Sequence, residues 1–346
     1  MRYPSNRQNC GFLIILLVLI LGGCAPAIQS AYFTIKGESA QFKKKNLDTA
    51  LEYYERAIIK NLDHAKAYAR AGWIWYDHKK SYPKAIDYFK TALSIEPELG
   101  QDRDFRIYKG LWGSYDGMYK WQEAIVYGKQ ALAVDANGPE VHYMLNGIGR
   151  AFMHLDEFRQ ALTYFNRAVE KVPDYLPPYG HIAFCHLNMG KPDEGLEILN
   201  RALAKTPEDS GLRTTRAWYY VLTGETDKAL QDSHKIIVPG PTGLGKTALN
   251  LFRVRGRIYL DLEKYEQAIK HLSRSGEKTF YVLVDRSLAH LRSGSYGKAA
   301  DDYRAALKAP RPSHRTVEGK LYIDRLALLK SEMTRIKRIT EKTISE

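Results

Sequence analysis

The stretch GRAFMHLDEFRQALTYFNRAVEKVP, residues 149–173, carries the pattern that decides the fold. Small and aromatic residues recur in it three or four positions apart, which is the spacing of one face of an α-helix. They are Gly149, Phe152, Ala161, Phe165 and Ala168, and Pro173 follows them. A small residue where two helices cross lets their axes approach closely, and an aromatic side chain fills the groove beside the crossing. The stretch therefore predicts two helices packed against each other.

The same pattern recurs along the chain and indicates an array of repeats. The stretch from Ala85 to Pro97 matches its second half, with Phe89 and Ala92 at the corresponding positions. The small residue of each second helix is found at Ala50, Ala85, Ala124, Ala161, Gly195, Ala229, Ala268 and Ala299. Successive positions are 35, 39, 37, 34, 34, 39 and 31 residues apart, which is enough for two helices and their turns.

This pattern resembles the tetratricopeptide repeat, a helix-turn-helix unit of 34 residues. The resemblance covers roughly residues 31–310 and implies an all-α solenoid of about eight repeats, in which stacked neighbours bury faces that one repeat cannot bury alone. Two repeats depart from the pattern. The first has Glu38 where a small residue is expected, and the third has Trp112 there and Gly128 in place of the later aromatic residue.

Residues 311–346 are expected to form a C-terminal capping helix, which starts near Val317. An apolar stripe is predicted on one face of this helix, at Leu321, Leu328 and Leu329. A basic outer face is predicted at Lys330, Arg335, Lys337 and Arg338. The pattern indicates a helix that closes the array, and it leaves open whether the basic face has a partner.

The first residues have the features of an export signal. Arg2 and Arg7 precede an unbroken apolar run from Phe12 to Leu21, which is shorter than the ~20 residues of a membrane-spanning helix. The run ends in LGGC at residues 21–24, which resembles the lipobox of bacterial lipoproteins. The resemblance implies that residues 1–23 form a signal peptide, that Cys24 is acylated and that residues 24–30 form a short tether. It also implies that Ala25, not being aspartate, permits sorting to an outer membrane.

The charge of the chain limits its partners. The formal net charge is +13, and removal of Arg2 and Arg7 with the signal leaves +11, because residues 1–23 contain no acidic residue. A basic exported protein is attracted to anionic surfaces, such as lipid headgroups or an anionic envelope polymer. We expect a protein of the bacterial envelope, lipid-anchored in the outer membrane and facing the periplasm, with no nucleic acid as partner.

Neither cysteines nor histidines suggest a reactive centre. Cys10 would leave with the signal and Cys24 would be acylated, so Cys185 remains alone and is predicted to be a buried apolar residue. Histidines at helical positions have no paired acidic cluster, and they are His142, His154, His181 and His186. We expect no catalytic residue, no metal and no cofactor, although spacing alone does not exclude a catalytic triad.

The concave wall of the solenoid is the predicted binding site. In the family that the chain resembles, exposed positions of each first helix line this wall, and the register assigns them to Trp73, Tyr76, Lys109, Tyr143, Asn146, Arg150, Phe184, Trp218, Arg253 and Arg257. Aromatic anchors beside arginines suit an extended or helical peptide with some acidic character. Stacking would align Arg150, Phe184, Trp218 and Arg257 along one groove. Packing between repeats is the alternative for each aromatic residue.

One motif indicates a different function. Residues 240–247, GPTGLGKT, match the phosphate-binding loop at Gly240, Gly245, Lys246 and Thr247. Such a loop needs a preceding strand, for which residues 236–238 are a candidate, and Phe280 to Asp285 could be a second strand. The repeat register instead places Ile236 at the end of a helix and Phe280 in a first helix, and favours a long loop between repeats.

Two function classes follow. The first is a non-enzymatic scaffold or adaptor that mediates protein–protein interaction in envelope assembly or maintenance. The second is a nucleotide-binding protein within a repeat array. A helix end at residues 236–238 would favour the scaffold, and a central strand would favour the nucleotide.

Overall fold

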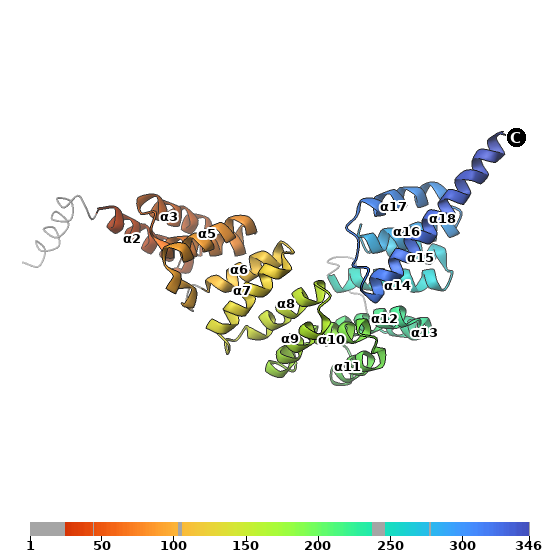
Figure 1. The fold of residues 1–346 in the computed structure, drawn as a ribbon, viewed down its shortest axis with the longest axis horizontal. Helices are drawn as coiled ribbons and strands as arrows, with labels where there is room; N and C mark the ends of the chain where they lie inside the picture. Colours follow the sequence, from red (N-terminus) through yellow and green to blue (C-terminus); the bar gives the residue numbers. More distant parts are fainter. Residues whose placement is uncertain (1–24, 44, 103–105, 237–245, 277, 346) are drawn as a thin grey trace, which may run out of the picture. The chain divides into compact units, whose positions relative to one another are not determined.

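The computed structural model describes residues 25–346 except 44, 103–105, 237–245, 277 and 346. Helices joined by turns account for its regular structure, and no strand occurs among the described residues (Figure 1). The predicted all-α architecture is therefore confirmed. The chain divides into two compact units, Met1–Ala151 and Phe152–Glu346, which are described separately below.

The first unit consists of consecutive helix pairs. Its α-helices are α2 (Ala25–Glu38), α3 (Leu47–Lys60), α4 (Ala65–Trp73), α5 (Tyr82–Ile95), α6 (Ile107–Gly117), α7 (Trp121–Val134) and α8, which extends from Val141 to His154. Short helical segments of other types follow three of them, and they are η1 (Ser39–Lys43), η2 (Ile74–His78) and η3 (Pro97–Gln101). Helix α2 packs on α3, α4 on α5 and α6 on α7, as expected for successive repeats.

The second unit continues the pairing. Its helices are α9 (Phe158–Lys171), α10 (Pro177–Asn188), α11 (Pro192–Lys205), α12 (Ser210–Thr223), α13 (Thr226–His234), α14 (Lys246–Asp261), α15 (Tyr265–Arg274), α16 (Phe280–Arg292), α17 (Tyr296–Lys308) and α18 (Val317–Ser345). The described residues therefore contain eight successive pairs, from α2 and α3 to α16 and α17, which confirms the predicted number of repeats.

The predicted register is confirmed by burial. All eight small residues assigned to the second helices are buried, and Ala161 and Ala268 have no exposed surface. The ring of Phe89 shows why the pattern has this form. A Cβ atom added at Gly72 would lie 2.9 Å from this ring, and one added at Gly110 would collide with it. The aromatic residue thus fills the space that glycine leaves on the adjacent helices.

In each of the two irregular repeats, a large side chain packs against a glycine on a neighbouring helix. In the first repeat Gly37, and not Glu38, is the small residue, since a Cβ there would lie 2.6 Å from Cε1 of Tyr54. In the third repeat Trp112 packs over two glycines, Gly128 and Gly147, and a side chain at either position would collide with its indole or with Ile148. The large residue and the missing aromatic side chain therefore compensate each other.

The expected tether at residues 24–30 is wrong for its described part, because α2 begins at Ala25. Ser30 is completely buried, and its hydroxyl donates a hydrogen bond of 2.7 Å to the carbonyl of Ala57. Pro26 is compatible with this helix because proline is tolerated in a first turn. The signal segment and Cys24 lie outside the described residues. Within the described part, no helix is both long and apolar enough to span a membrane.

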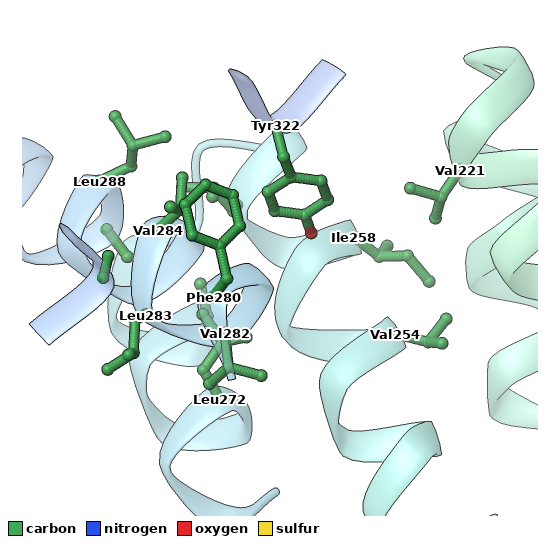
Figure 2. Packing of buried hydrophobic residues seen from close by; sticks show 14 of the residues in the cluster. Val221, Val254, Ile258, Leu272, Phe280, Val282, Leu283, Val284, Leu288 and Tyr322 are labelled. Carbon is green, nitrogen blue, oxygen red and sulfur yellow. The ribbon is translucent and has the colours of Figure 1, made fainter. Parts of the chain in front are cut away.

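Helix α18 is the predicted closing helix, but its apolar stripe is different. Tyr322, Leu326 and Leu329 are buried, whereas Leu328 is 47% exposed and Leu321 is only half-buried. The stripe is rotated because α18 packs on α16 through Tyr322, which enters the core formed by α14 and α16 (Figure 2). On the predicted basic face, Lys330 and Arg335 are exposed, and the side chains of residues 337 and 338 are not described.

Candidate functional site

In the first unit, most of the predicted wall aromatics pack inside the unit. Trp73 contacts Tyr76 and Phe89 edge-to-face, with ring centroids 5.4 Å and 5.7 Å apart. Asn146 is also buried, at 6% exposure. Tyr143 differs from these residues because 53% of its surface is exposed. These contacts of Trp73 lie within its own repeat, and Trp73 and Tyr76 are half-buried. Tyr76 also packs on the next repeat, because a Cβ at Gly113 would collide with its hydroxyl, and Tyr143 faces solvent.

The predicted cations of the first unit have acidic partners within the chain. Lys109 forms an ion pair with Glu140, and one guanidinium nitrogen of Arg150 lies 3.0 Å and 3.1 Å from the two carboxylate oxygens of Asp116. Arg150 belongs to the first unit, whereas Phe184, Trp218 and Arg257 belong to the second. Their predicted alignment along one groove therefore stays a prediction.

In the second unit, Trp218 is buried and not an exposed anchor. Only 3% of its surface is accessible, because the guanidinium of Arg253 lies 4.6 Å from the centre of its ring system. The same guanidinium lies 5.6 Å from the ring centre of Tyr281, and its Nη1 is 3.6 Å from Glu318 of α18. Trp218 and Arg253 were predicted to face a partner, but Arg253 instead packs between aromatic rings and a carboxylate of its own chain.

Arg257, also predicted to face the groove, is the centre of a buried polar cluster. Its Nε lies 2.9 Å from Asp261, its Nη1 lies 3.7 Å from Asp285, and its guanidinium is 5.4 Å from the ring centre of Tyr322. Asp285 also accepts hydrogen bonds from the Tyr322 hydroxyl and from Arg325. Burial, together with the carboxylate of Asp285, raises the pKa of Tyr322 well above its ordinary value. This cluster joins α14, α16 and α18.

The segment before α18 is also held by hydrogen bonds to the same unit. The hydroxyl of Ser313 donates to Asp156 at 2.7 Å, and the backbone amide of Val317 donates to the side-chain oxygen of Asn188 at 2.8 Å. The amide nitrogen of Asn188 in turn donates to the carbonyl of Phe184 at 2.7 Å. Residues 313–325 therefore lie against the first helices α10, α14 and α16, where an extended or helical peptide with some acidic character was expected.

The sequence-based search missed the acidic half of this cluster, which comprises Asp261, Asp285 and Glu318, as well as Tyr322. Asp285 carried a usable signal. It lies in the apolar stretch FYVLVD at residues 280–285, and a carboxylate on a buried helix needs a buried partner. The pattern could not name that partner, since Tyr322 is 37 residues away.

The second unit also contains an open cleft. It has a volume of about 610 Å³ and is formed by three successive first helices, α10, α12 and α14. The residues that line it are Leu176, Pro177, Gly180, His181, Phe184, Asp209, Gly211, Leu212, Thr214, Thr215 and Asn250. Of the predicted wall residues, Phe184 alone is among these described lining residues. We refer to this region as the α10–α14 cleft.

The α10–α14 cleft combines apolar groups, uncharged polar groups and the carboxylate of Asp209. Phe184 supplies an aromatic face, and Gly180 lets α10 and α12 approach, because a Cβ there would lie 3.1 Å from Thr215. The hydroxyl of Thr215 donates to the carbonyl of Gly211 at 2.9 Å and keeps its lone pairs as acceptors. Asp209 caps α12 by accepting from the amide of Leu212. Among the described residues no lysine or arginine lines this cleft, so its described wall lacks the groups that would select an acidic peptide.

The phosphate-loop motif comes after α13 in the chain, and its last two residues begin α14. Ile236 follows α13 and is buried, and Lys246 and Thr247 are the first two residues of α14. Gly240 and Gly245 lie outside the described residues. The stretch that begins at Phe280 is the start of α16. The described residues therefore contain no strand that could precede or flank a phosphate loop, and the end of α13 at His234, two residues before Ile236, favours the scaffold interpretation.

The remaining candidates for reactive chemistry are structural. Cys185 is completely buried, and burial raises its pKa to about 12, so the prediction of a buried apolar cysteine is confirmed. His186 lies 3.0 Å from Glu194, and the ring of His181 stacks on Phe165. Within the described residues, no group of three histidine, cysteine, aspartate or glutamate side chains could hold a metal ion.

Comparisons with known proteins agree with this architecture. One tetratricopeptide-repeat model matches residues 39–100, 118–175 and 253–314, and a second matches residues 152–219. The chain is 24% identical over 211 residues to the anaphase-promoting complex subunit CDC16 of Saccharomyces cerevisiae. The match covers 59% of this chain but only 24% of the length of that protein.

Solved structures show the same fold. A tetratricopeptide repeat protein from Parabacteroides merdae, 20% identical, has a TM-score of 0.60, and the match covers 75% of this chain and 98% of that protein. The yeast protein Tom70, 16% identical, has a TM-score of 0.56 over 92% of this chain and 68% of its own. The family models together match more than half of the sequence. The chain therefore belongs to the tetratricopeptide-repeat family.

Proposed function

We propose that this protein is a lipid-anchored scaffold of the bacterial envelope that holds an extended segment of a partner protein in the α10–α14 cleft. The tetratricopeptide-repeat fold supports a protein–protein interaction scaffold. The observation that carries the proposal is the cleft itself, an open volume of about 610 Å³ formed by three successive first helices. The neighbouring wall at Arg253 and Arg257 is covered by the chain's own α18 and is not part of the proposed site.

The lining of the cleft suits an extended peptide. Its volume lies within the ~300–1,000 Å³ of typical ligand sites, which is room for a few residues. Thr214, Thr215 and Asn250 offer hydroxyl and amide groups to the backbone of a peptide, and Phe184 offers an apolar contact to one of its side chains. Because basic residues are missing from the described lining, we propose a neutral or weakly polar segment and not an acidic one.

The proposed location rests on the sequence. Cys24 follows an apolar run in a lipobox-like ending, and Ala25 permits outer-membrane sorting by the same resemblance. Acylation would hold the chain on the periplasmic side of the outer membrane. The charge of +11 that would remain after removal of the signal suits an anionic surface there, such as lipid headgroups or an envelope polymer. We infer a role in envelope assembly or maintenance.

Site-specific photo-crosslinking in intact envelopes tests the cleft. A photoreactive residue at Thr215 in the cleft is compared with one at Thr163, an exposed threonine on the second helix α9. We expect one discrete crosslinked partner from position 215 and none from position 163. Phe184→Ala should reduce affinity for that partner about thirtyfold, the usual effect of losing an interface anchor worth ~2 kcal/mol.

A second variant separates binding from folding. Thr215→Trp fills the cleft from its wall, and it should abolish the crosslinked product while the helical circular dichroism is retained. Equal crosslinking at both positions, or undiminished capture by Phe184→Ala and Thr215→Trp, would move the site elsewhere. Metabolic labelling with a fatty-acid probe tests the anchor separately. The probe should mark the wild type and not Cys24→Ala.

A further inference from the structure

Helix α2 has an exposed apolar stripe. Ile28, Tyr32 and Ile35 are 45%, 55% and 65% exposed, and Phe42 in the following segment η1 is 58% exposed. The spacing of Ile28, Tyr32 and Ile35, four and three residues, places these three on one face of α2. Phe42 lies beyond the end of α2, and the guanidinium of Arg70 is 5.3 Å from its ring centre. The opposite face, with Ser30, is buried. We call Ile28, Tyr32, Ile35 and Phe42 the α2 stripe.

The charges around the α2 stripe are almost entirely positive. Lys36, Lys43 and Lys45 are exposed, and the ammonium group of Lys36 lies 5.4 Å from the ring centre of Tyr32. Glu38 is the sole acidic residue between positions 25 and 45, and it lies 3.6 Å from Arg70. An apolar stripe of isoleucine and aromatic residues with a lysine border is the composition of a helix that lies in the interface of an anionic membrane.

We propose that the α2 stripe rests in the headgroup region of the membrane to which Cys24 is anchored. This inference builds on the proposed lipid anchor. Helix α2 begins at the residue after Cys24, so Ile28 follows the acylated position by four residues with no flexible linker between them. Acyl chains on Cys24 would bring the stripe to the lipid surface, and the lysines would meet anionic headgroups. The stripe would add an apolar contact to the one that the acyl chains make.

This contact would give the first unit a defined orientation. Because α2 is packed on α3 through its buried face, a helix that lies in the membrane plane would hold the repeats beside it at the surface. A flexible tether would instead leave the scaffold free to rotate. With the α2 stripe in the membrane, the first unit would keep one orientation relative to the membrane plane.

The test uses the full chain, purified from membranes with its lipid. A bimane fluorophore is placed on Ile35→Cys, which is specific because Cys24 would be acylated and Cys185 is buried. Val126→Cys on α7, where the native side chain is 53% exposed, is the matched control. Both proteins are incorporated into phosphatidylethanolamine and phosphatidylglycerol vesicles with or without brominated lipid. Bromine in the acyl chains should quench bimane at position 35 at least about twofold and leave position 126 unchanged.

The outcomes separate the stripe from the anchor. A chain that carries the fatty-acid label but shows equal fluorescence at position 35 in both kinds of vesicle overturns the inference and leaves the anchor in place. A variant made without residues 1–23 and with Cys24→Ala carries no fatty acid, so bimane still reacts with Ile35→Cys alone. Mixed with the same vesicles, it supports the stripe alone if position 35 is quenched, and neither proposal if it is not. The stripe could instead contact a second copy of the chain. In that case the bimane at position 35 would be shielded from water without being quenched by bromine, and the Ile35→Cys variant without bimane would form a disulfide-linked dimer. This result would overturn the inference.

Discussion

The hydroxyl of Tyr322 donates a hydrogen bond to the carboxylate of Asp285, and this buried contact joins the closing helix α18 to the first helix α16. Arg257 and Arg325 lie beside the same carboxylate, at 3.7 Å and 2.8 Å. A buried carboxylate is tolerated only when it is paired and hydrogen-bonded. The pair therefore explains why α18 packs against the wall of the second unit, where a partner had been predicted to bind.

Removal of this hydroxyl should destabilise the second unit. Tyr322→Phe keeps the buried ring but leaves one acceptor of Asp285 without its donor, so we expect a loss of about 1–3 kcal/mol in the free energy of unfolding. Tyr296→Phe is the control, because Tyr296 is 51% exposed, and it should change stability by less than about 0.5 kcal/mol. Urea denaturation measures both. Equal stability of the two variants would contradict a structural role for the contact.

Acid should destabilise the protein through His271. Burial, with Arg255 and Arg274 nearby, lowers its pKa from 6.5 to about 4. Between these values the unfolded chain binds a proton that the folded chain does not, so stability is complete above pH 6.5 and is lost as the pH falls towards 4. His271→Phe keeps the ring against Phe252 and Tyr259, and it should remove about 1–3 kcal/mol of this loss. Parallel pH profiles of the wild type and the variant would show that His271 is not involved.

Gly195→Ala should destabilise the protein, although alanine has a higher helix propensity than glycine. The Cβ would lie 2.7 Å from the carbonyl oxygen of Ala183 and would collide with the hydroxyl of Tyr219. Gly195→Ala should therefore destabilise by about 1–3 kcal/mol. At Gly297 in α17 an added Cβ has no neighbour within 4 Å among the described residues, so Gly297→Ala should stabilise by up to about 1 kcal/mol. Thermal unfolding decides, and a stabilising Gly195→Ala would show that the two helices do not approach this closely.

Trp112 and Gly147 should be energetically coupled. Gly147→Ala alone should overpack against the indole and lose about 1–3 kcal/mol. In a chain that already carries Trp112→Phe, the same change should cost less, with a coupling of at least about 0.5 kcal/mol. A double-mutant cycle in urea measures it. Strict additivity would mean that the two residues do not touch.

The phosphate-loop match should have no nucleotide function. Helix α13 ends at His234, two residues before Ile236, and the described residues contain no strand that could precede the motif. We expect no saturable binding of ATP or GTP at micromolar concentrations, and Lys246→Ala should retain capture of the partner at Thr215. Calorimetry of the wild type and the variant tests this. Saturable binding that disappears in Lys246→Ala would restore the nucleotide alternative.

The helical repeats and their register could be predicted from the order of the residues alone. Ala161, Phe165 and Ala168 predicted the buried crossing correctly because each repeat makes its main contacts within itself and with its neighbours, so their spacing is written locally in the chain. In the third repeat the sequence showed two departures from the pattern, a large Trp112 at the small position and Gly128 at the aromatic position. That they compensate each other could be seen only once the neighbouring helices were in place.

Which wall positions are open depends on contacts between distant parts of the folded chain. Trp218 and Arg257 have the register of groove residues, yet both are buried, because Arg253 covers the first and α18 packs against the second. The contacts that place α18 join residues far apart in the chain, such as Ser313 and Asp156, which are separated by 157 positions. A period of 34 residues carries no information about such pairings, since they depend on how the stacked repeats bring distant side chains within hydrogen-bonding distance.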